Sequence, residues 1–303
     1  MKAKNLSKIL LSALLVCNIV IKADVKPKGA KAYSIKQLAI ADKLYSLHEY
    51  TQALQAYTNV ANKPENADPL SLLLAQANLA NMYYSGIGTP VDYKLALIYN
   101  TLVSDNTLSP LQAQSEANSR LANMYRLGLG TQPNYKMVIK YSTAVINNPK
   151  ASNILVFSNR LTLANLYHFA QAGLKKPNYA LALKYYKDIT KEINAEPISK
   201  IAAQINLGVM NANGEGVKKS ATIAQDYYQQ ALNKLREILN DAKQNDPVVI
   251  SGANYYLGIM YAYGYGVPNN GSVALENFKK VTSTTPVLYT QAQTIIKDNL
   301  NIK

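Results

Sequence analysis

Five times between residues 79 and 278, the chain repeats one pattern of apolar and polar positions that predicts a pair of helices. In every copy a leucine stands four residues before a central residue, which is a tyrosine in four copies and an asparagine in the other. Since about four residues make one helical turn, the two share a face of the first helix. The central residues are Tyr83, Tyr125, Tyr167, Asn211 and Tyr261. A related helix pair with a tighter turn is predicted over 40–61.

Glycine and proline mark the ends of the first helix. In four copies the helix stops at a Gly-X-Gly pair, whose first glycine can adopt the left-handed conformation that ends a helix. These pairs are Gly86/Gly88, Gly128/Gly130, Gly214/Gly216 and Gly264/Gly266. They follow a helix rather than a strand, so they do not indicate a phosphate-binding loop. Proline favours the start of a first helix at Pro69, Pro110, Pro197 and Pro247.

The second helix of each pair begins at a residue that can cap it, and then carries a small or branched residue and an aromatic one. The predicted caps are Asp92, Asn134, Asn178, Ser220 and Asn270. The aromatic residues are Tyr99, Tyr141, Tyr185, Tyr227 and Phe278. Because their spacing follows the helical repeat, we interpret these rings as packing between helices rather than as a cofactor or base-stacking site.

The combination of Leu-Ala/Gly-X-Met-Tyr, Gly-X-Gly and Ala-X-X-X-Tyr resembles the Sel1-like repeat family, a tetratricopeptide-type group, over about residues 70–283. The resemblance implies an all-α fold, a right-handed α/α superhelical solenoid of about six helix pairs over 34–286 with a capping helix in 287–303. It also implies a non-catalytic adaptor or scaffold that binds a protein or peptide, with the first helices lining the concave surface. The third copy departs from the pattern, since Ala170 and Gly173 with two extra residues replace the glycine pair.

Residues 1–23 are typical of a secretory signal peptide: three lysines precede an apolar run over 9–21, and Ala23 offers a cleavage position. The mature chain would then begin at Asp24 with a basic flexible lead-in over 24–33, in the periplasm or outside the cell. Two alternatives stay open. The segment is retained as an anchor, or Cys17 is lipidated, and only in these two cases is a membrane a partner.

Composition argues against several chemistries. Cys17 is the single cysteine, and the two histidines, His48 and His168, lie far apart, so we expect no metal site, no cofactor and no catalytic residues. Removal of residues 1–23 lowers the formal net charge from +14 to +10. The remaining basic residues are spread along the chain, which together with the export signal argues against a nucleic-acid partner.

Two features of the first helices are candidate partner-binding sites. Asn81, Asn123 and Asn165 each stand two residues before a central tyrosine, nearly opposite the apolar face, and would form a ladder of amides for a peptide backbone. The alternative is that they are surface residues that were duplicated with the repeat and have no role in binding. In the last two copies that position becomes Val209 and Ile259, which with Tyr256 form an apolar stripe that a partner or the terminal helix could cover.

The predicted function is an exported adaptor that binds a protein or peptide. The alternative is a cell-envelope factor that binds glycan or peptidoglycan, for which tyrosine and asparagine side chains would also suffice.

Overall fold

The computed structural model describes residues 29–62 and 67–300, and within them every regular element is a helix. The predicted signal peptide, its cleavage position and Cys17 lie outside the described residues, as does the lead-in up to residue 28. The remainder of the predicted lead-in is the start of a helix. The helices are α2 (Ala30–Ser46), α3 (Tyr50–Ala61), α4 (Pro69–Ser85), α5 (Tyr93–Asp105), α6 (Leu111–Leu127), α7 (Tyr135–Ile146), α8 (Asn153–His168), α9 (Tyr179–Lys191), α10 (Pro197–Asn213), α11 (Ala221–Asn240), α12 (Pro247–Tyr263), α13 (Gly271–Lys279) and α14 (Pro286–Leu300).

The chain divides into two compact units, residues 1–75 and 76–303. In the first unit α2 and α3 form an antiparallel pair. Tyr57 of α3 is buried and donates its hydroxyl to Asp42 Oδ1 of α2 at 2.7 Å, while burial raises the pKa of that carboxyl. The pair predicted over 40–61 therefore exists, and its first helix begins ten residues earlier than that range.

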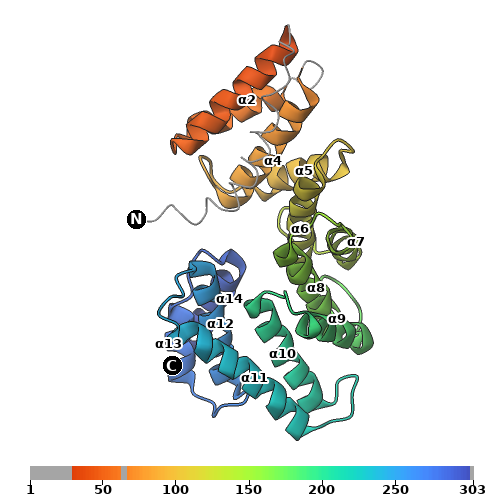
Figure 1. Ribbon diagram of the computed structural model, residues 1–303, viewed down its shortest axis with the longest axis vertical. Coiled ribbons are helices and arrows are strands. Elements are labelled where there is room, and N and C mark those ends of the chain that lie inside the picture. Colours follow the sequence, from red (N-terminus) through yellow and green to blue (C-terminus); the bar gives the residue numbers. More distant parts are fainter. Residues whose placement is uncertain (1–28, 63–66, 301–303) are drawn as a thin grey trace. The chain divides into compact units, whose positions relative to one another are not determined.

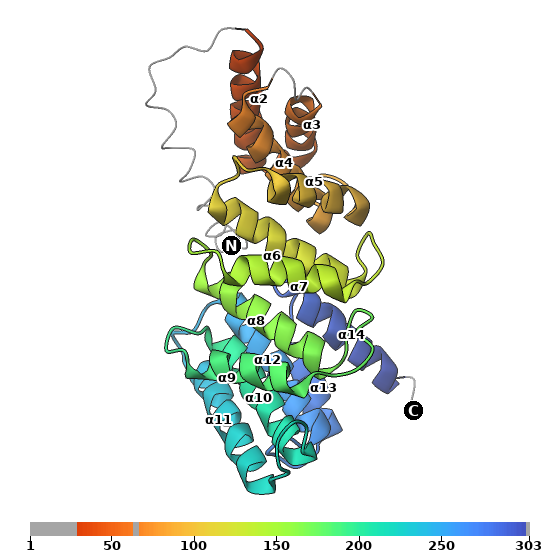
Figure 2. The same cartoon turned by 90° about the vertical axis from the view of Figure 1, so that its right-hand side faces the viewer.

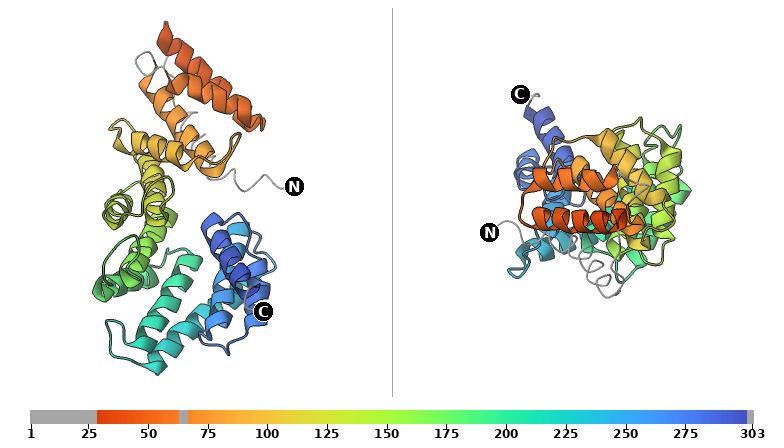
Figure 3. Two further views of the ribbon diagram at one scale, coloured as in Figure 1. Left: turned by 180° about the vertical axis from the view of Figure 1, so that it is seen from behind. Right: turned by 90° about the horizontal axis from the view of Figure 1, so that it is seen from above.

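In the second unit the helices form consecutive packed pairs (Figures 1 and 2). The first helices α6, α8, α10 and α12 each pack against their own second helix and against the second helix of the preceding pair. Direct contacts also join α6 to α8, α8 to α10 and α10 to α12, whereas the described second helices make no comparable contacts with one another. The first helices therefore form the closer-spaced, inner layer of this unit, which Figure 1 and the rear view in Figure 3 both show.

The predicted helix starts are confirmed. All five second helices have a side-chain cap at the predicted residue, for example Asp92, whose Oδ1 accepts from the backbone N–H groups of Lys94 and Leu95 at 3.0 Å. The other four caps are Asn134, Asn178, Ser220 and Asn270. Proline occupies the first turn of α10 and α12, while Pro110 is the residue before α6.

The glycine pairs also behave as predicted, and both members of each pair are left-handed, with φ between 69° and 82°. A backbone bond then ties the turn together, because the N–H of the cap residue donates to the carbonyl of the central residue. This bond measures 2.9 Å from Asp92 to Tyr83 and 2.9 Å from Ser220 to Asn211. Loss of the tyrosine in the fourth copy therefore leaves this turn intact, since only main-chain atoms are used.

The irregular third turn keeps the same bond, from Asn178 N to Tyr167 O at 2.8 Å. Ala170 and Ala172 take the left-handed conformation, with φ of 49° and 53°, in place of the missing first glycine. The Ala172 carbonyl accepts from the N–H of Tyr135, the first residue of α7, at 2.8 Å. The longer loop is thus attached to the preceding pair.

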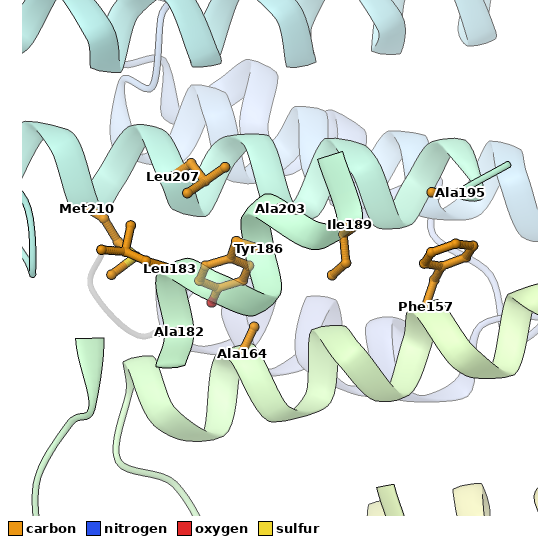
Figure 4. Close-up of a cluster of buried hydrophobic side chains, with 10 residues drawn as sticks. All are labelled: Phe157, Ala164, Ala182, Leu183, Tyr186, Ile189, Ala195, Ala203, Leu207 and Met210. Atoms are coloured by element: carbon orange, nitrogen blue, oxygen red, sulfur yellow. The ribbon is translucent and has the colours of Figure 1, made fainter. Parts of the chain in front are cut away.

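The interior is built from small residues facing large ones. Figure 4 shows one such cluster, where Tyr186 of α9 lies between Ala164 of α8 and Ala203 of α10, all fully buried. Where the second helix presents Phe278, the facing first helix carries Gly258, and a Cβ added there would lie 2.7 Å from the ring. In both copies a small residue on the first helix makes room for an aromatic ring on the second helix.

The central tyrosines are half-buried. The ring of Tyr125 stacks on that of Tyr141 at a centroid separation of 5.8 Å, and it also packs against a cluster formed by Val138, Leu163 and Leu166. Tyr83 stacks on Tyr99 in the same way at 5.9 Å. The tyrosines of both helices are thus packing residues, as interpreted, at the rim of the interior rather than at its centre.

Candidate functional site

The inner face of residues 76–303 is lined by α4 after residue 75 and by α6, α8, α10 and α12. Asn81, Asn123 and Asn165 all lie on these helices and are half-buried. Each is hydrogen-bonded within the chain, however, so they are not the free amides that the sequence pattern led us to expect. Their role in binding stays a prediction.

Five polar side chains of α4 and α6 form one connected group, which we call the arginine cluster: Asn81, Tyr84, Arg120, Asn123 and Arg126. Asn123 Nδ2 donates to the Tyr84 hydroxyl at 3.1 Å, and Asn123 Oδ1 accepts from Arg126 at 2.7 Å. The Arg120 guanidinium lies 5.7 Å from the centre of the Tyr84 ring, a cation–π distance. The asparagine of one repeat is therefore held by a tyrosine of the preceding repeat.

Arg120 is further fixed by two amide oxygens. It donates to Asn100 Oδ1 at 3.1 Å, and its contact with Asn81 Oδ1 is longer, at 3.5 Å. Sequence reasoning overlooked both arginines. The available signal was their spacing, since each stands three residues from Asn123, and residues three apart are neighbours on a helix surface.

Both guanidiniums lie in a desolvated environment. Burial lowers the pKa of Arg120, opposed by the nearby Glu116 carboxylate and Tyr84, and it lowers the pKa of Arg126, opposed by Tyr84 and Tyr256. Arginine stays charged throughout the physiological range, so these are two cations in a partly dry site. Tyr256 belongs to α12, so that helix and α6 both contribute to the electrostatics of the inner face.

A second polar group surrounds His168, which is 3% exposed. His168 Nε2 lies 2.8 Å from Glu215 Oε2, and Nδ1 lies 3.2 Å from the Tyr186 hydroxyl. That hydroxyl donates to Asn165 Oδ1 at 2.6 Å. Glu215 thus has its partner in His168 of the preceding repeat. Because both ring nitrogens of His168 have partners within the chain, we interpret this group as a structural support for Asn165.

The residues of the predicted apolar stripe are only half-buried, but they lie in two different clusters. Val209 packs against a cluster formed by α10, α11 and α12, whereas Ile259 packs against one that includes Ala292 and Ile296 of α14. Tyr256 contacts both clusters. The terminal helix therefore covers part of the stripe, which was the alternative left open by the sequence.

Histidine, cysteine, aspartate and glutamate side chains nowhere form a group of three that could hold a metal ion within the described part of the chain. Of the helices described, none combines the length and apolar character needed to cross a membrane.

Comparison with known proteins identifies the repeat. A family model for the Sel1 repeat matches residues 73–99, 115–141, 163–187, 201–234 and 251–280. These segments coincide with the five helix pairs from α4 to α13. No curated protein gives a significant sequence match.

Similar solved structures include two bacterial proteins. One is a protective antigen present in uropathogenic Escherichia coli strains that displays an SLR fold; it is 19% identical, with a TM-score of 0.48, and the match covers 90% of this chain and 50% of that one. The other is a Sel1 repeat protein from Oxalobacter formigenes, 22% identical, with a TM-score of 0.47 and coverage of 82% and 84%. This chain thus spans about half the length of the Escherichia coli antigen.

Proposed function

The chain belongs to the Sel1-like repeat family, and from this premise we propose that it is an exported, non-catalytic adaptor that binds a protein or peptide. Sel1 repeats form a fold that commonly mediates protein–protein interaction and typically serves as a scaffold. The proposal assigns the binding surface to the inner face of the first helices.

One observation carries the proposal: the polar side chains of the inner face are held in place while keeping donors for a partner. Arg126 makes its one described hydrogen bond to Asn123, and a guanidinium has five N–H donors. The Asn165 carboxamide oxygen is occupied by Tyr186, while its amide nitrogen has no acceptor among the described residues. Side chains that are already ordered lose little conformational entropy on binding, which favours affinity.

Site-specific photo-crosslinking tests the assigned surface. A photoreactive amino acid at Leu127 lies one helical turn beyond Asn123 and is 40% exposed. The matched control is Leu102 on the second helix α5, which is 45% exposed. Irradiation of the full chain with the envelope fraction should give a protein adduct from position 127 and none from position 102. Equal adducts from both positions, or an adduct with peptidoglycan instead of protein, would contradict the proposal.

Export is supported by the amino-terminal sequence pattern alone. N-terminal sequencing of the native protein should begin at Asp24. A chain that begins at Met1 would refute export by cleavage, and a lipid on Cys17 would place the protein at a membrane.

A further inference from the structure

We infer that the arginine cluster is a binding site for the carboxylates of an extended acidic peptide segment. This inference rests on the proposed function and names the chemistry of its partner. It assigns Arg126 as the main contact, with Arg120 as a second cation and Asn123 as a backbone-recognising amide.

Within the part of the chain that the structure describes, the two guanidiniums of the cluster lack an ion-pair partner. Among the described residues, neither Arg120 nor Arg126 has a carboxylate oxygen within ion-pair distance, although both guanidiniums are half-buried. The nearest carboxylate of α6 is Glu116, which instead accepts from Gln112 Nε2 at 3.3 Å. A half-buried cation without an ion-pair partner lowers the stability of the folded chain. Binding of an anion beside it forms charge-assisted hydrogen bonds that offset this cost.

Arg126 is held by fewer contacts than Arg120. Arg120 is enclosed by two amide oxygens and the Tyr84 ring, which fixes it as a source of positive potential. Arg126 donates to Asn123 alone among the described residues, and it stands at the last turn of α6, where the chain turns away at Gly128. Its free N–H groups can therefore form the paired hydrogen bonds that a carboxylate accepts.

The spacing of the two arginines suits an extended peptide. Arg120 and Arg126 are six residues apart on one helix, which separates them by about 9 Å along its axis. An extended chain advances about 3.3 Å per residue and points alternate side chains to the same face, so acidic side chains two residues apart, about 7 Å along the chain, can reach both cations.

A peptide fits this site better than a nucleic acid does. Nucleic-acid affinity comes from many cations that follow a row of phosphates. The inner face offers two arginines here, and the next arginine along the first helices, Arg160 on α8, is already paired with Glu192 at 3.6 Å. A short acidic segment needs only the two cations, with amides for its backbone.

The test measures fluorescence anisotropy of a labelled peptide of alternating glycine and glutamate, titrated with the full chain at low salt. A peptide of alternating glycine and glutamine and a single-stranded DNA of similar length serve as comparisons. We expect the glutamate peptide alone to bind, and Arg126→Gln to weaken that binding by roughly tenfold or more, because hydrogen bonds to charged groups are strong. Arg126→Lys, which keeps the charge but not the paired geometry, should lie between.

The matched control is Arg236→Gln on α11, which removes the same charge from an exposed arginine of a second helix. It should leave the affinity within about twofold, since exposed charges interact weakly through salt solution. Equal losses from Arg126→Gln and Arg236→Gln would show unspecific attraction and overturn the inference. DNA binding that is as tight and as dependent on Arg126 would overturn the choice of a peptide. Should Arg126→Gln fail to fold, Arg126→Lys against the parent decides the question.

The inference and the proposed function fail separately. If the protein adduct from position 127 persists in Arg126→Gln and is not displaced by the glutamate peptide, the adaptor function holds and the acidic-peptide site is wrong. If the glutamate peptide binds through Arg126 but position 127 gives no protein adduct in the envelope fraction, the anion site holds and the adaptor function is wrong.

Discussion

Alanine in place of Gly130 tests how closely consecutive repeats approach. Gly130 is the second glycine of its turn, with φ of 70°, and it faces the first residues of α5 in the preceding pair. A Cβ at this position would overlap the Tyr93 carbonyl and lie 2.8 Å from the Lys94 nitrogen. These are main-chain atoms at a helix start, so no side-chain rotation can relieve the contact.

Two costs add for Gly130→Ala. The left-handed conformation costs an alanine about 1–2 kcal/mol, and overpacking against fixed atoms costs about 1–3 kcal/mol more. Reduced freedom of the unfolded chain returns about 0.4–1 kcal/mol. Gly173→Ala is the matched control, because Gly173 has φ of 85° but nothing within 4 Å of an added Cβ. Gly173→Ala therefore has the cost of the left-handed conformation and the gain from the less flexible unfolded chain, but no overpacking cost.

Urea denaturation followed by far-UV circular dichroism measures both variants against the parent. Gly130→Ala should lose more of the free energy of unfolding than Gly173→Ala, by about 1–3 kcal/mol. Equal losses would mean that backbone conformation alone selects these glycines, and the argument for close contact between repeats would be wrong.

Three further predictions concern the interior. Ala182→Leu should lower the free energy of unfolding by about 1–3 kcal/mol in the same assay, because Ala182 is fully buried; an unchanged value would contradict the repeat register. Tyr186→Phe should cost about 1–3 kcal/mol by removing the hydroxyl that donates to Asn165, and a neutral effect would deny that this group supports the asparagine. Burial raises the pKa of Tyr141 from 10.0 to about 12, so between these values only the unfolded chain loses the proton. Stability should therefore fall as pH rises through that window, and less steeply in Tyr141→Phe; parallel curves would refute this assignment.

Local features of the fold could be read from the sequence because they depend on residues close together in the chain. The caps at Asp92 and Asn134 and the stops at Gly128 and Gly214 each use bonds that span a few residues. Five copies of the same pattern also fixed the pairing of helices, since each copy by itself predicts the same two elements.

Contacts between repeats could not be read in that way. The partners of Asn123 and Glu215, which are Tyr84 and His168, lie 39 and 47 residues away. A helical phase indicates which side of a helix a residue occupies, but not which side chain of the next helix meets it.

The main-chain bond that closes each turn makes the connecting loop a place where length can change. In the third copy two extra residues are accommodated while the bond from Asn178 to Tyr167 stays at 2.8 Å. The chain has therefore already accepted one insertion without giving up the junction between its two helices. Foreign segments, such as an epitope or a fluorescent reporter, should be tolerated between the exposed Lys175 and Lys176, beyond the Ala172 carbonyl that bonds to Tyr135, better than in the regular turns, where Gly216 and Gly266 touch the preceding pair. A reporter placed there would follow the protein to its destination while leaving the inner face unmodified.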